Sequence, residues 1–388
     1  MRAAAAAVMR GPERLEVTTF PIPDVEPGAV LMKVALSGVC GTDKHTFRGE
    51  TKQYSGTPHE REARFPLICG HENVGTVAEI GGAVRDSQGR LLQVGDRIVP
   101  GANLPCGHCH FCLGSYPYYF CTNLEDYGNS LSCASPPHLL GGWADYMYLL
   151  PGTPLFRVPD DLPDEIAVLT EVMAVTHGIE TAFRLLGETG GPAFGHTVAV
   201  IGIGPLGLCH LIKARLLGAA RLVAIEPLQS RRRTAETFGA TLTMDPRSSQ
   251  EEERIAAVKD HTEGVGPDVV VDCSGLPHTF VESARMVRIG GAVIEAGAFV
   301  DLGEVGLNPA DICARNVAIL GVGGERARAY LPSMRLLAAN QDRLPLERIV
   351  THRFPLLEAE RAIGVSQMDG AMKVVIKPHD HAGGGDGH

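Results

Sequence analysis

Four cysteines with the spacing C-x2-C-x2-C-x8-C lie in the stretch PCGHCHFCLGSYPYYFC. They are Cys106, Cys109, Cys112 and Cys121. Thiolates are soft donors, and four of them this close together suit a tetrahedral zinc ion that closes a loop on itself. A site with four protein ligands has no open position, so its zinc stabilises structure and does no chemistry. We therefore expect a structural zinc lobe over residues 100–125.

A second set of metal-binding residue types is spread more widely. Cys40 lies in VCGTDKH, His71 and Glu72 lie in CGHE, and Glu171 lies in LTEVM. One cysteine, one histidine and one carboxylate leave the fourth zinc position to water or substrate, as in a catalytic site. Each residue alone also fits a simpler interpretation, such as a core thiol, a core histidine or a surface charge. Together, and beside the four-cysteine cluster, they favour a catalytic metal site.

A glycine pattern, G-x-G-x-x-G, stands between a strand-like and a helix-like segment. Gly202 would allow a tight turn, Gly204 would let the backbone approach a pyrophosphate, and Gly207 would let helix and strand pack closely. The free N–H groups at the start of the helix favour phosphate. We include Pro205 and Leu206, between the last two glycines, in the predicted cofactor site.

Glu226 ends the next strand-like segment, nineteen residues after Gly207. A carboxylate there accepts hydrogen bonds from the adenosine ribose and repels a 2′-phosphate, which predicts NAD rather than NADP. Arg231 is a candidate for the ribose edge that would tolerate a 2′-phosphate, although such arginine runs are more often a solvated helix face. Three later positions complete the predicted cofactor site: Cys273, Ala296 and Gly297.

Two kinds of architecture are needed to position these groups. Residues 1–175 contain short apolar runs broken by Gly and Pro, which predict a β-rich, barrel-like domain. Over residues 176–321, strand-like and helix-like segments alternate, which predicts parallel βαβ units. Residues 322–378 form a third segment, and the Gly-rich residues 379–388 are expected to be a disordered tail.

The composition excludes several other classes. The 388 residues are enough for two domains, and the net charge of −10 argues against nucleic acid as a partner. No run of eighteen apolar residues occurs, so we expect no membrane span. The short Ala run at the start does not fit a signal peptide, and the cysteine spacing fits a reducing compartment. We expect a cytoplasmic protein.

At this point the chain resembles the zinc-dependent alcohol and polyol dehydrogenases of the medium-chain dehydrogenase/reductase superfamily. The resemblance covers nearly the whole chain. It rests on the CGTD and GHE segments, the four-cysteine lobe, GGWADY at 141–146 and the glycine pattern. It implies an α/β fold with a GroES-like β-rich catalytic domain, a Rossmann domain with a doubly wound parallel sheet, and a C-terminal return of the chain to the first domain.

The resemblance also implies two zinc ions per chain. In the family the residues matching Cys40 and His71 bind the catalytic zinc. Relatives with Glu at the place of Glu171 tend to act on polyols, sugars or threonine, and in them Glu72 also approaches the metal. The third ligand is therefore either Glu171 or Glu72. The last cysteine usually follows the third after seven residues; here eight intervene, so the lobe must bulge by one residue.

The implied mechanism is alkoxide formation at zinc, followed by hydride transfer to the nicotinamide. Thr42 matches the first group of the family's proton relay, which passes the proton to a cofactor ribose hydroxyl. His45 matches the terminal group, with a surface histidine as the alternative. Asp43 is expected to hydrogen-bond a ligand histidine. Glu72 is included among the catalytic residues.

We therefore expect an NAD-dependent zinc alcohol dehydrogenase that interconverts a polar secondary alcohol and its ketone. The alcohol would be a polyol, sugar, cyclitol or amino alcohol. A carbonyl reductase acting mainly toward the alcohol in specialised metabolism is the alternative. A nucleotide-binding sensor would keep the glycine pattern but would not need Cys40, His71 and Thr42.

The substrate pocket and the oligomer are predicted less sharply. Trp143, the loop at 51–66 and the segment Tyr127 to Leu140 are candidates for the pocket lining. Relatives form dimers or tetramers, often through the edge strands of their Rossmann sheets, so a homodimer or homotetramer is expected. The segments AVIEAG and VAILGV are candidates for that edge.

Overall fold

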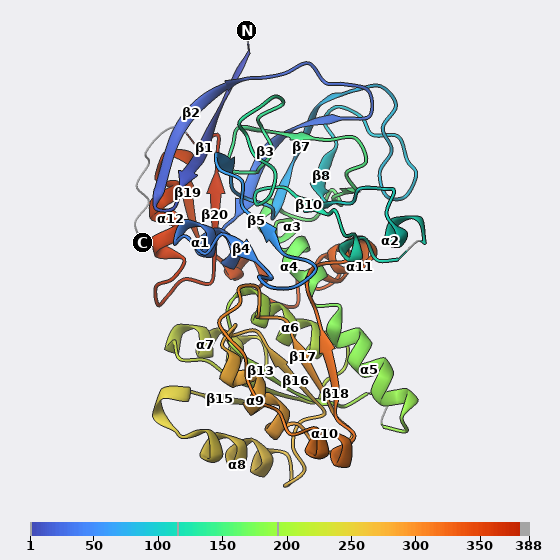
Figure 1. Ribbon diagram of the computed structural model, residues 1–388, viewed down its shortest axis with the longest axis vertical. Helices are drawn as coiled ribbons and strands as arrows, with labels where there is room; N and C mark the ends of the chain where they lie inside the picture. The colour runs from blue at the N-terminus through green and yellow to red at the C-terminus, as the bar shows by residue number, and fades with distance from the viewer. Residues whose placement is uncertain (1, 115, 192–193, 381–388) are drawn as a thin grey trace. The chain divides into compact units, whose positions relative to one another are not determined.

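The computed structural model of the chain describes residues 2–114, 116–191 and 194–380 (Figure 1). The chain divides into two compact units, residues 1–174 with 326–388, and residues 175–325. The segment after residue 325 thus groups with the first unit. Of the tail, residues 381–388 lie outside the described residues. His379 is placed, with its Nε2 2.9 Å from the Asp145 carbonyl oxygen.

The first unit is built around an antiparallel sheet with the strand order β12-β8-β7-β3-β20-β19, in which β11 also pairs with β3. Only β19 and β20 run parallel to each other within this path. The strands of this sheet are β3 (Val30–Gly38), β7 (Asn73–Ile80), β8 (Arg97–Pro100), β11 (Tyr146–Leu149), β12 (Leu155–Arg157), β19 (Val350–Pro355) and β20 (Lys373–Lys377).

Side chains on both faces of strand β3 are packed in apolar clusters. Alternate residues of a strand point to opposite faces. Val30, Met32 and Val34 join one apolar cluster, and Leu31 joins the other. Both clusters are buried, so β3 is central and its register is fixed by packing.

Smaller strands complete the unit. Strand β1 begins with a run of alanines, which are weak strand formers. Ala4, Ala6 and Ala7 are nevertheless fully buried, because small side chains let β1 pack closely, and Ala7 N–H donates to the Trp143 carbonyl at 2.8 Å. The strands are β1 (Ala3–Gly11), β2 (Arg14–Pro21), β4 (Lys52–Gln53), β5 (Arg61–Glu62), β6 (Leu67–Ile68), β9 (Asn103–Leu104) and β10 (Glu125–Asp126).

The helices of the first unit are short, except for α11. This helix is held by Tyr330, whose ring stacks on Phe156 at 4.4 Å and whose hydroxyl accepts from Ala102 N–H at 3.1 Å. The helices are α1 (Gly41–Phe47), α2 (His110–Leu113), α3 (Asp164–Ala167), α4 (Thr170–Val175, whose last residue falls in the second unit), α11 (Ala327–Ala338) and α12 (Ala359–Val365).

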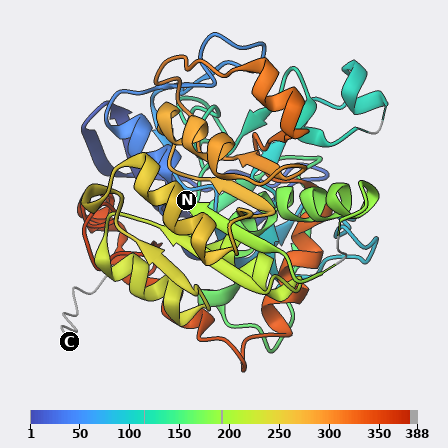
Figure 2. The ribbon, with the colours of Figure 1, turned by 90° about the horizontal axis from the view of Figure 1, so that it is seen from below.

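The second unit is a parallel sheet with the strand order β15-β14-β13-β16-β17-β18 and with helices on both faces (Figures 1 and 2). The order runs outward in both directions from β13, which is the doubly wound arrangement. The strands are β13 (Thr197–Ile201), β14 (Arg221–Ile225), β15 (Leu242–Met244), β16 (Val269–Asp272), β17 (Ala292–Glu295) and β18 (Ala318–Gly321). The helices are α5 (Gly178–Glu188), α6 (Pro205–Leu216), α7 (Gln229–Thr237), α8 (Glu251–His261), α9 (Pro277–Met286) and α10 (Pro309–Arg315).

The central strands of this sheet are buried along their whole length, as a sheet covered on both faces requires. Their apolar sequences, TVAVI and VVVD, reflect that double burial. The predicted α/β fold class, a β-rich domain joined to a doubly wound domain, is confirmed. Within the described residues no single helix has the length and hydropathy of a membrane span. Only Asp164–Val175 taken together with Gly178–Glu188 meets that test, and buried core helices meet it too.

Candidate metal and cofactor sites

Cys40, His71 and Glu72 come together in the first unit. Cys40 precedes α1, and His71 and Glu72 lie between β6 and β7. The Cys40 sulfur, a ring nitrogen of His71 and a carboxylate oxygen of Glu72 all lie within 4.8 Å of one another. His71 and Glu72 are buried and Cys40 is partly buried. Residues predicted from separate sequence segments thus converge on one point.

Close backbone packing holds these two segments together. Gly70 adopts a φ of +93°, and a Cβ there would lie 2.3 Å from Ser37 Oγ and 2.5 Å from Trp143 Cδ1. Gly38 N–H donates to the Glu72 carbonyl at 2.8 Å. Trp143 is fully buried, with its indole N–H 3.3 Å from the Gly38 carbonyl. Trp143 is therefore a core residue that supports the site, and its prediction as pocket lining is wrong.

Asp43 accepts hydrogen bonds from the backbone of both segments. Its carboxylate accepts from Cys40 N–H at 2.7 Å and from Gly70 N–H at 3.4 Å. The sequence predicts a hydrogen bond to a ligand histidine in place of these backbone bonds. A polar contact at the His71 ring comes from Asn129, whose side-chain nitrogen is 3.4 Å from Nδ1. Sequence reasoning missed Asn129, which carries no recognisable motif.

A buried lysine also belongs to this site. Lys373, the first residue of β20, forms an ion pair with Glu72, and both side chains are 1% exposed. Although burial lowers it, the charges of Glu72 and Cys40 raise the pKa of Lys373 above its ordinary value. The sequence carries one signal for this residue, a lysine at the head of the apolar strand KVVIK.

The charges around the site suit a cation. Burial lowers the pKa of His71, yet the neighbouring Cys40, Asp43 and Glu171 raise it well above its ordinary value. The negative groups around His71 therefore favour positive charge at this site. A thiolate, an imidazole and a carboxylate are zinc donors. The donor set thus fits a zinc ion. Glu171 influences the charge of the site, but it does not belong to the close group formed by Cys40, His71 and Glu72.

The two predicted relay residues lie on α1. The Thr42 hydroxyl is buried and has no hydrogen-bond partner within the described part of the chain. His45 is partly exposed, and its Nδ1 contacts the Glu50 carboxylate and lies 3.1 Å from an Arg48 nitrogen. Burial, opposed by Glu50, lowers the pKa of His45. A neutral imidazole near neutral pH suits proton transfer.

The loop at 51–66 forms a small hairpin of β4 and β5. Its stem is anchored by Gln53, which donates to Asp126 at 3.3 Å, and by Arg61, 3.9 Å from the same carboxylate. The tip, residues 56–60, is exposed. Tyr127, in the other segment predicted to line a pocket, is fully buried, and its hydroxyl accepts from Leu150 N–H at 2.7 Å.

The four-cysteine lobe brings its sulfurs together despite the long last spacing. All four sulfurs lie within 4.8 Å of one another. A short 3-10 turn, Tyr118–Phe120, precedes Cys121 and helps to accommodate the extra residue. Arg326 anchors the lobe by donating to the Tyr119 hydroxyl at 3.0 Å.

The thiols of this lobe differ strongly in acidity. Backbone N–H groups of Cys112 and Thr122 lower the pKa of Cys109 to about 5, whereas burial raises that of Cys121 to about 12. Four thiolates cannot coexist here without a cation to neutralise them. The lobe therefore also fits a zinc ion.

The glycine pattern of the second unit has the geometry that its role requires. Gly202, with a φ of +85°, leads out of β13. A Cβ on Gly207 would lie 1.9 Å from the Gly202 carbonyl, so no side chain fits where α6 crosses β13. At Gly204 the space is open, with only an Arg231 nitrogen 4.0 Å away. Pro205 and Leu206 begin α6.

Glu226 follows β14 and is buried. Its carboxylate accepts from Ile203 N–H at 2.7 Å and from Leu228 N–H at 3.0 Å. It thereby ties the glycine turn to the end of the next strand. Arg231, on α7, lies beside Gly204 and so faces the turn.

The remaining predicted cofactor residues lie at the same carboxyl edge of the sheet. Cys273 follows β16, and Ala296 and Gly297 follow β17. A Cβ on Gly297 would lie 2.5 Å from Gly275 N, so these two loops touch through their backbones. Ligands of open parallel sheets bind at this edge.

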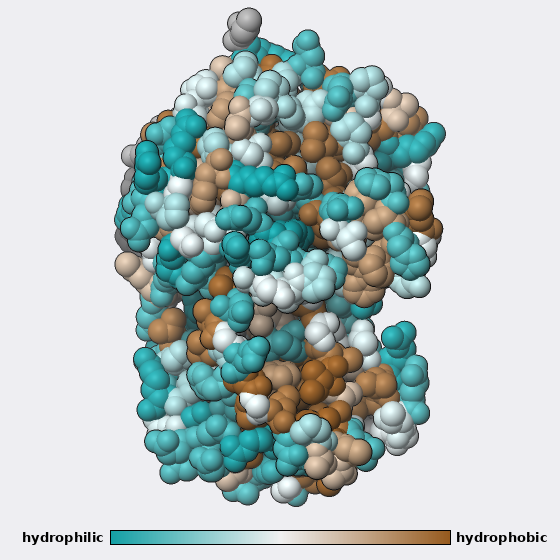
Figure 3. All heavy atoms as spheres, in the orientation of Figure 1, coloured by the Kyte–Doolittle hydropathy of each residue, from teal (hydrophilic) through white to brown (hydrophobic). Residues whose placement is uncertain are grey.

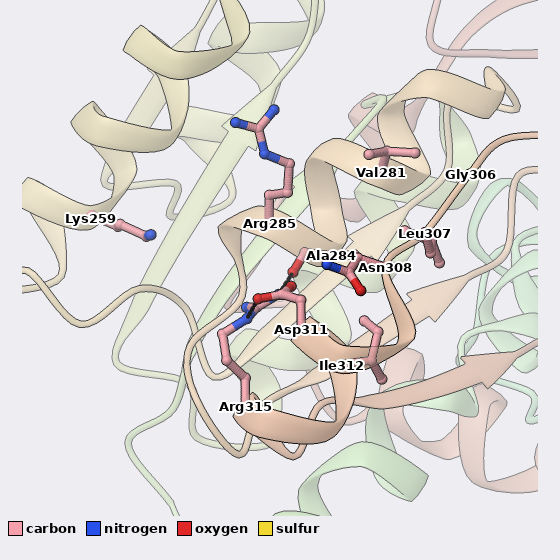
Figure 4. A pocket seen from close by; sticks show the side chains of 10 residues that line it. All are labelled: Lys259, Val281, Ala284, Arg285, Gly306, Leu307, Asn308, Asp311, Ile312 and Arg315. Carbon is pink, nitrogen blue, oxygen red and sulfur yellow. Dashed lines mark hydrogen bonds and ion pairs between the residues drawn. The ribbon is translucent and has the colours of Figure 1, made fainter.

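A separate pocket of about 560 Å³ opens elsewhere on the second unit (Figure 4). Helices α8, α9 and α10 supply most of its lining, and Arg315 pairs with Asp311 inside it. None of the predicted site residues line this pocket.

Known proteins match the chain along most of its length. A family model described as alcohol dehydrogenase GroES-like domain matches residues 26–160, and one described as zinc-binding dehydrogenase matches residues 205–339. The 5-exo-hydroxycamphor dehydrogenase of Pseudomonas putida is 31% identical over 97% of this chain and 99% of its own length. The sorbitol dehydrogenase of Ovis aries is 30% identical over 95% of both.

A solved structure agrees with these relatives. The alcohol dehydrogenase of Thermotoga maritima superimposes with a TM-score of 0.87 at 30% identity, over 98% of this chain and all of the other. The fold, the family models and the relatives agree. The chain belongs to the zinc-dependent alcohol and polyol dehydrogenases of the medium-chain dehydrogenase/reductase superfamily.

Proposed function

We propose that this enzyme interconverts a polar secondary alcohol and its ketone with NAD(H). The observation that carries the proposal is the convergence of Cys40, His71 and Glu72. Two residues after Cys40, the buried hydroxyl of Thr42 has no hydrogen-bond partner among the described residues. The substrate class is a polyol, sugar, cyclitol or amino alcohol. Sorbitol dehydrogenase among the relatives supports this class.

Cys40, His71 and Glu72 would hold the catalytic zinc, with Glu171 contributing negative charge beside them. The bound zinc supplies a Lewis acid that lowers the pKa of the substrate hydroxyl. The bound nicotinamide supplies the hydride acceptor. Thr42 Oγ1 accepts the hydrogen bond of the reacting hydroxyl, and His45, partly exposed, exchanges the proton with water. The four-cysteine lobe would hold a second, structural zinc.

NAD is proposed over NADP because the Glu226 carboxylate lies at the end of β14, where it disfavours a 2′-phosphate. Arg231 beside Gly204 is the feature that would favour NADP instead. Paired assays with the two cofactors distinguish these cases.

The test is a substrate panel with zinc analysis. Purified enzyme is offered sorbitol, inositol, threonine and a bicyclic apolar alcohol, the last because one relative is named for hydroxycamphor oxidation. Nicotinamide absorbance reports turnover. The wild type should carry about two zinc ions per chain, and Cys40→Ser should lose one of them together with all turnover. Full zinc and unchanged turnover in Cys40→Ser would refute the catalytic site.

A further inference from the structure

Lys373 and Glu72 meet in a space that the backbone leaves open for them. The Lys373 ammonium contacts Glu72 Oε2 and lies 3.4 Å from the Val39 carbonyl oxygen. A Cβ on Gly38 would lie 1.9 Å from Glu72 Oε2 and 2.9 Å from Lys373 Cε. Any residue larger than glycine at position 38 would therefore displace the pair.

Stability alone does not account for this pair. Removing two charges from water carries a large desolvation penalty, and apolar residues of similar size are often as stable or more so. The carboxylate of Glu72 also belongs to the close group with Cys40 and His71. One buried carboxylate thus faces two cationic positions, the lysine ammonium and the metal position.

We propose that Lys373 is a positioning residue that holds Glu72 by one carboxylate oxygen and so limits how strongly Glu72 binds the catalytic metal. The inference rests on the proposed function, because Cys40, His71 and Glu72 must hold a metal for it to apply. With its charge shared with the ammonium, Glu72 is a weakened donor that can exchange with another ligand. Without Lys373, the carboxylate loses this ammonium, so the metal neutralises more of its charge and Glu72 binds the metal more tightly.

The test measures metal binding rather than activity. In Lys373→Met, which keeps the length of the side chain without its charge, zinc in the Cys40 site should bind about tenfold more tightly in competition with a chelator. Cobalt placed in that site should show shifted visible bands, because its carboxylate ligand has changed. Lys373→Arg, which keeps the charge, should return both readouts toward those of the wild type.

Two controls separate this role from a purely structural one. Lys213 is another buried lysine, paired with Glu180 in the second unit, and Lys213→Met should leave zinc affinity and cobalt bands unchanged. In a Glu72→Gln background, Lys373→Met should have no further effect on either readout. Should Lys373→Met fail to fold, Lys373→Gln replaces it, since a neutral amide still donates to Glu72.

An unchanged zinc affinity and unchanged cobalt bands in the Lys373 variant would overturn the inference, even if the variant is less stable. Failure of the proposed function has a different signature. In that case Cys40→Ser would retain full zinc, whereas failure of this inference alone leaves the zinc loss in Cys40→Ser intact.

Discussion

Thr42 and Glu226 differ in how much of their hydrogen-bonding capacity neighbouring groups already use. The Thr42 hydroxyl is buried without a partner among the described residues, and so it is available to a substrate hydroxyl. The Glu226 carboxylate, in contrast, already accepts two backbone N–H groups. A substitution of Glu226 therefore also removes hydrogen bonds to the surrounding backbone, and its test must separate that effect from the loss of charge.

Glu226→Gln should shift cofactor preference. The amide keeps one acceptor for the Ile203 or Leu228 N–H but lacks the charge that repels a 2′-phosphate. We expect the ratio of kcat/KM with NADP to that with NAD to rise by about tenfold, because one charge–charge repulsion is removed. Glu226→Ala, which also releases the turn, should raise the same ratio but weaken binding of both cofactors. A constant ratio in both variants would show that Glu226 does not face the ribose.

Glu295 should make stability depend on pH. Burial, reinforced by Asp272, raises the pKa of Glu295 to about 7. The folded state then binds a proton more tightly than the unfolded state does. The stabilisation from this group is complete below the ordinary carboxyl pKa and is lost as pH rises through about 7. Because the group is partly exposed, solvent screening reduces the effect to about 2 kcal/mol at most.

Glu295→Gln should remove this dependence. The amide oxygen can still accept from Gly297 and Ala298 N–H, as the carboxylate does at 2.9 Å. Unfolding free energies measured from about pH 5 to about pH 8 should therefore fall less in the variant than in the wild type. Parallel curves for the two proteins would contradict the raised pKa.

The convergence of some residues could be predicted from sequence because they sit in short, specific motifs. Cys40 and His71 do, and the structure brings them together with Glu72. Asn129 could not be predicted, because it reaches the site only through the fold. Lys373 stands out as a lysine at the head of an apolar strand, but that pattern does not reveal its partner Glu72. Asp43 lies in the predicted region, but its bonds go to the N–H groups of Cys40 and Gly70 and not to a ligand histidine.

At the scale of elements, the four-cysteine lobe has little buried apolar core of its own. Its exposed side chains include Leu113, Tyr116 and Phe120, so few apolar groups are left to pack inside it. The 3-10 turn before Cys121 compensates for the extra residue in the spacing. Cross-linking by a metal is the expected source of order in so small a segment.

Cys121→Ser should separate structure from catalysis. A serine hydroxyl is a poor zinc ligand, so we expect zinc to fall from about two ions to about one per chain. Alcohol oxidation should persist at low temperature, because Cys40 and His71 are untouched. Cleavage within the lobe during limited proteolysis should become faster. Complete loss of turnover with an intact second zinc would instead assign the lobe a catalytic part.

Elements with strong periodicity were predicted well and those defined by tertiary packing were not. The strands β13 and β14 lie where the sequence indicates strand-like segments, before the glycine pattern and before Glu226, and β17 lies in AVIEAG. Strand β19 and helix α12 were missed. The burial pattern of β19 is mixed, because only part of the strand faces the core, so its sequence THRF lacks a clear alternation.

For the whole molecule, the open question is how copies of the chain assemble. Within the described residues β18 pairs only with β17, so it forms an edge of the sheet. Strand β17 has partners on both sides, and its prediction as edge is wrong. Ile319 on β18 is 43% exposed, and in Figure 3 apolar side chains gather over the region of β18 and α10.

Ile319→Lys should therefore weaken self-association. A lysine on an edge strand opposes pairing with another strand and adds charge to an apolar surface. We expect light scattering to show a smaller assembly than for the wild type at equal concentration. Leu357→Lys, at an exposed leucine of the first unit, is the control and should leave the mass unchanged. Equal masses for all three proteins would place the interface elsewhere.

Lys373, the ion-pair partner of Glu72, is synthesised late in translation. Lys373 is 334 residues away from Val39, the carbonyl of which it also reaches, so ribosomal synthesis delivers Cys40, His71 and Glu72 long before their lysine. Until β20 is added to the sheet, the growing chain presents the carboxylate without its ammonium. A nascent chain that captured zinc at that stage would hold it with a different donor strength from that of the finished enzyme. The order of translation thus gives a reason for metal loading to follow completion of the sheet.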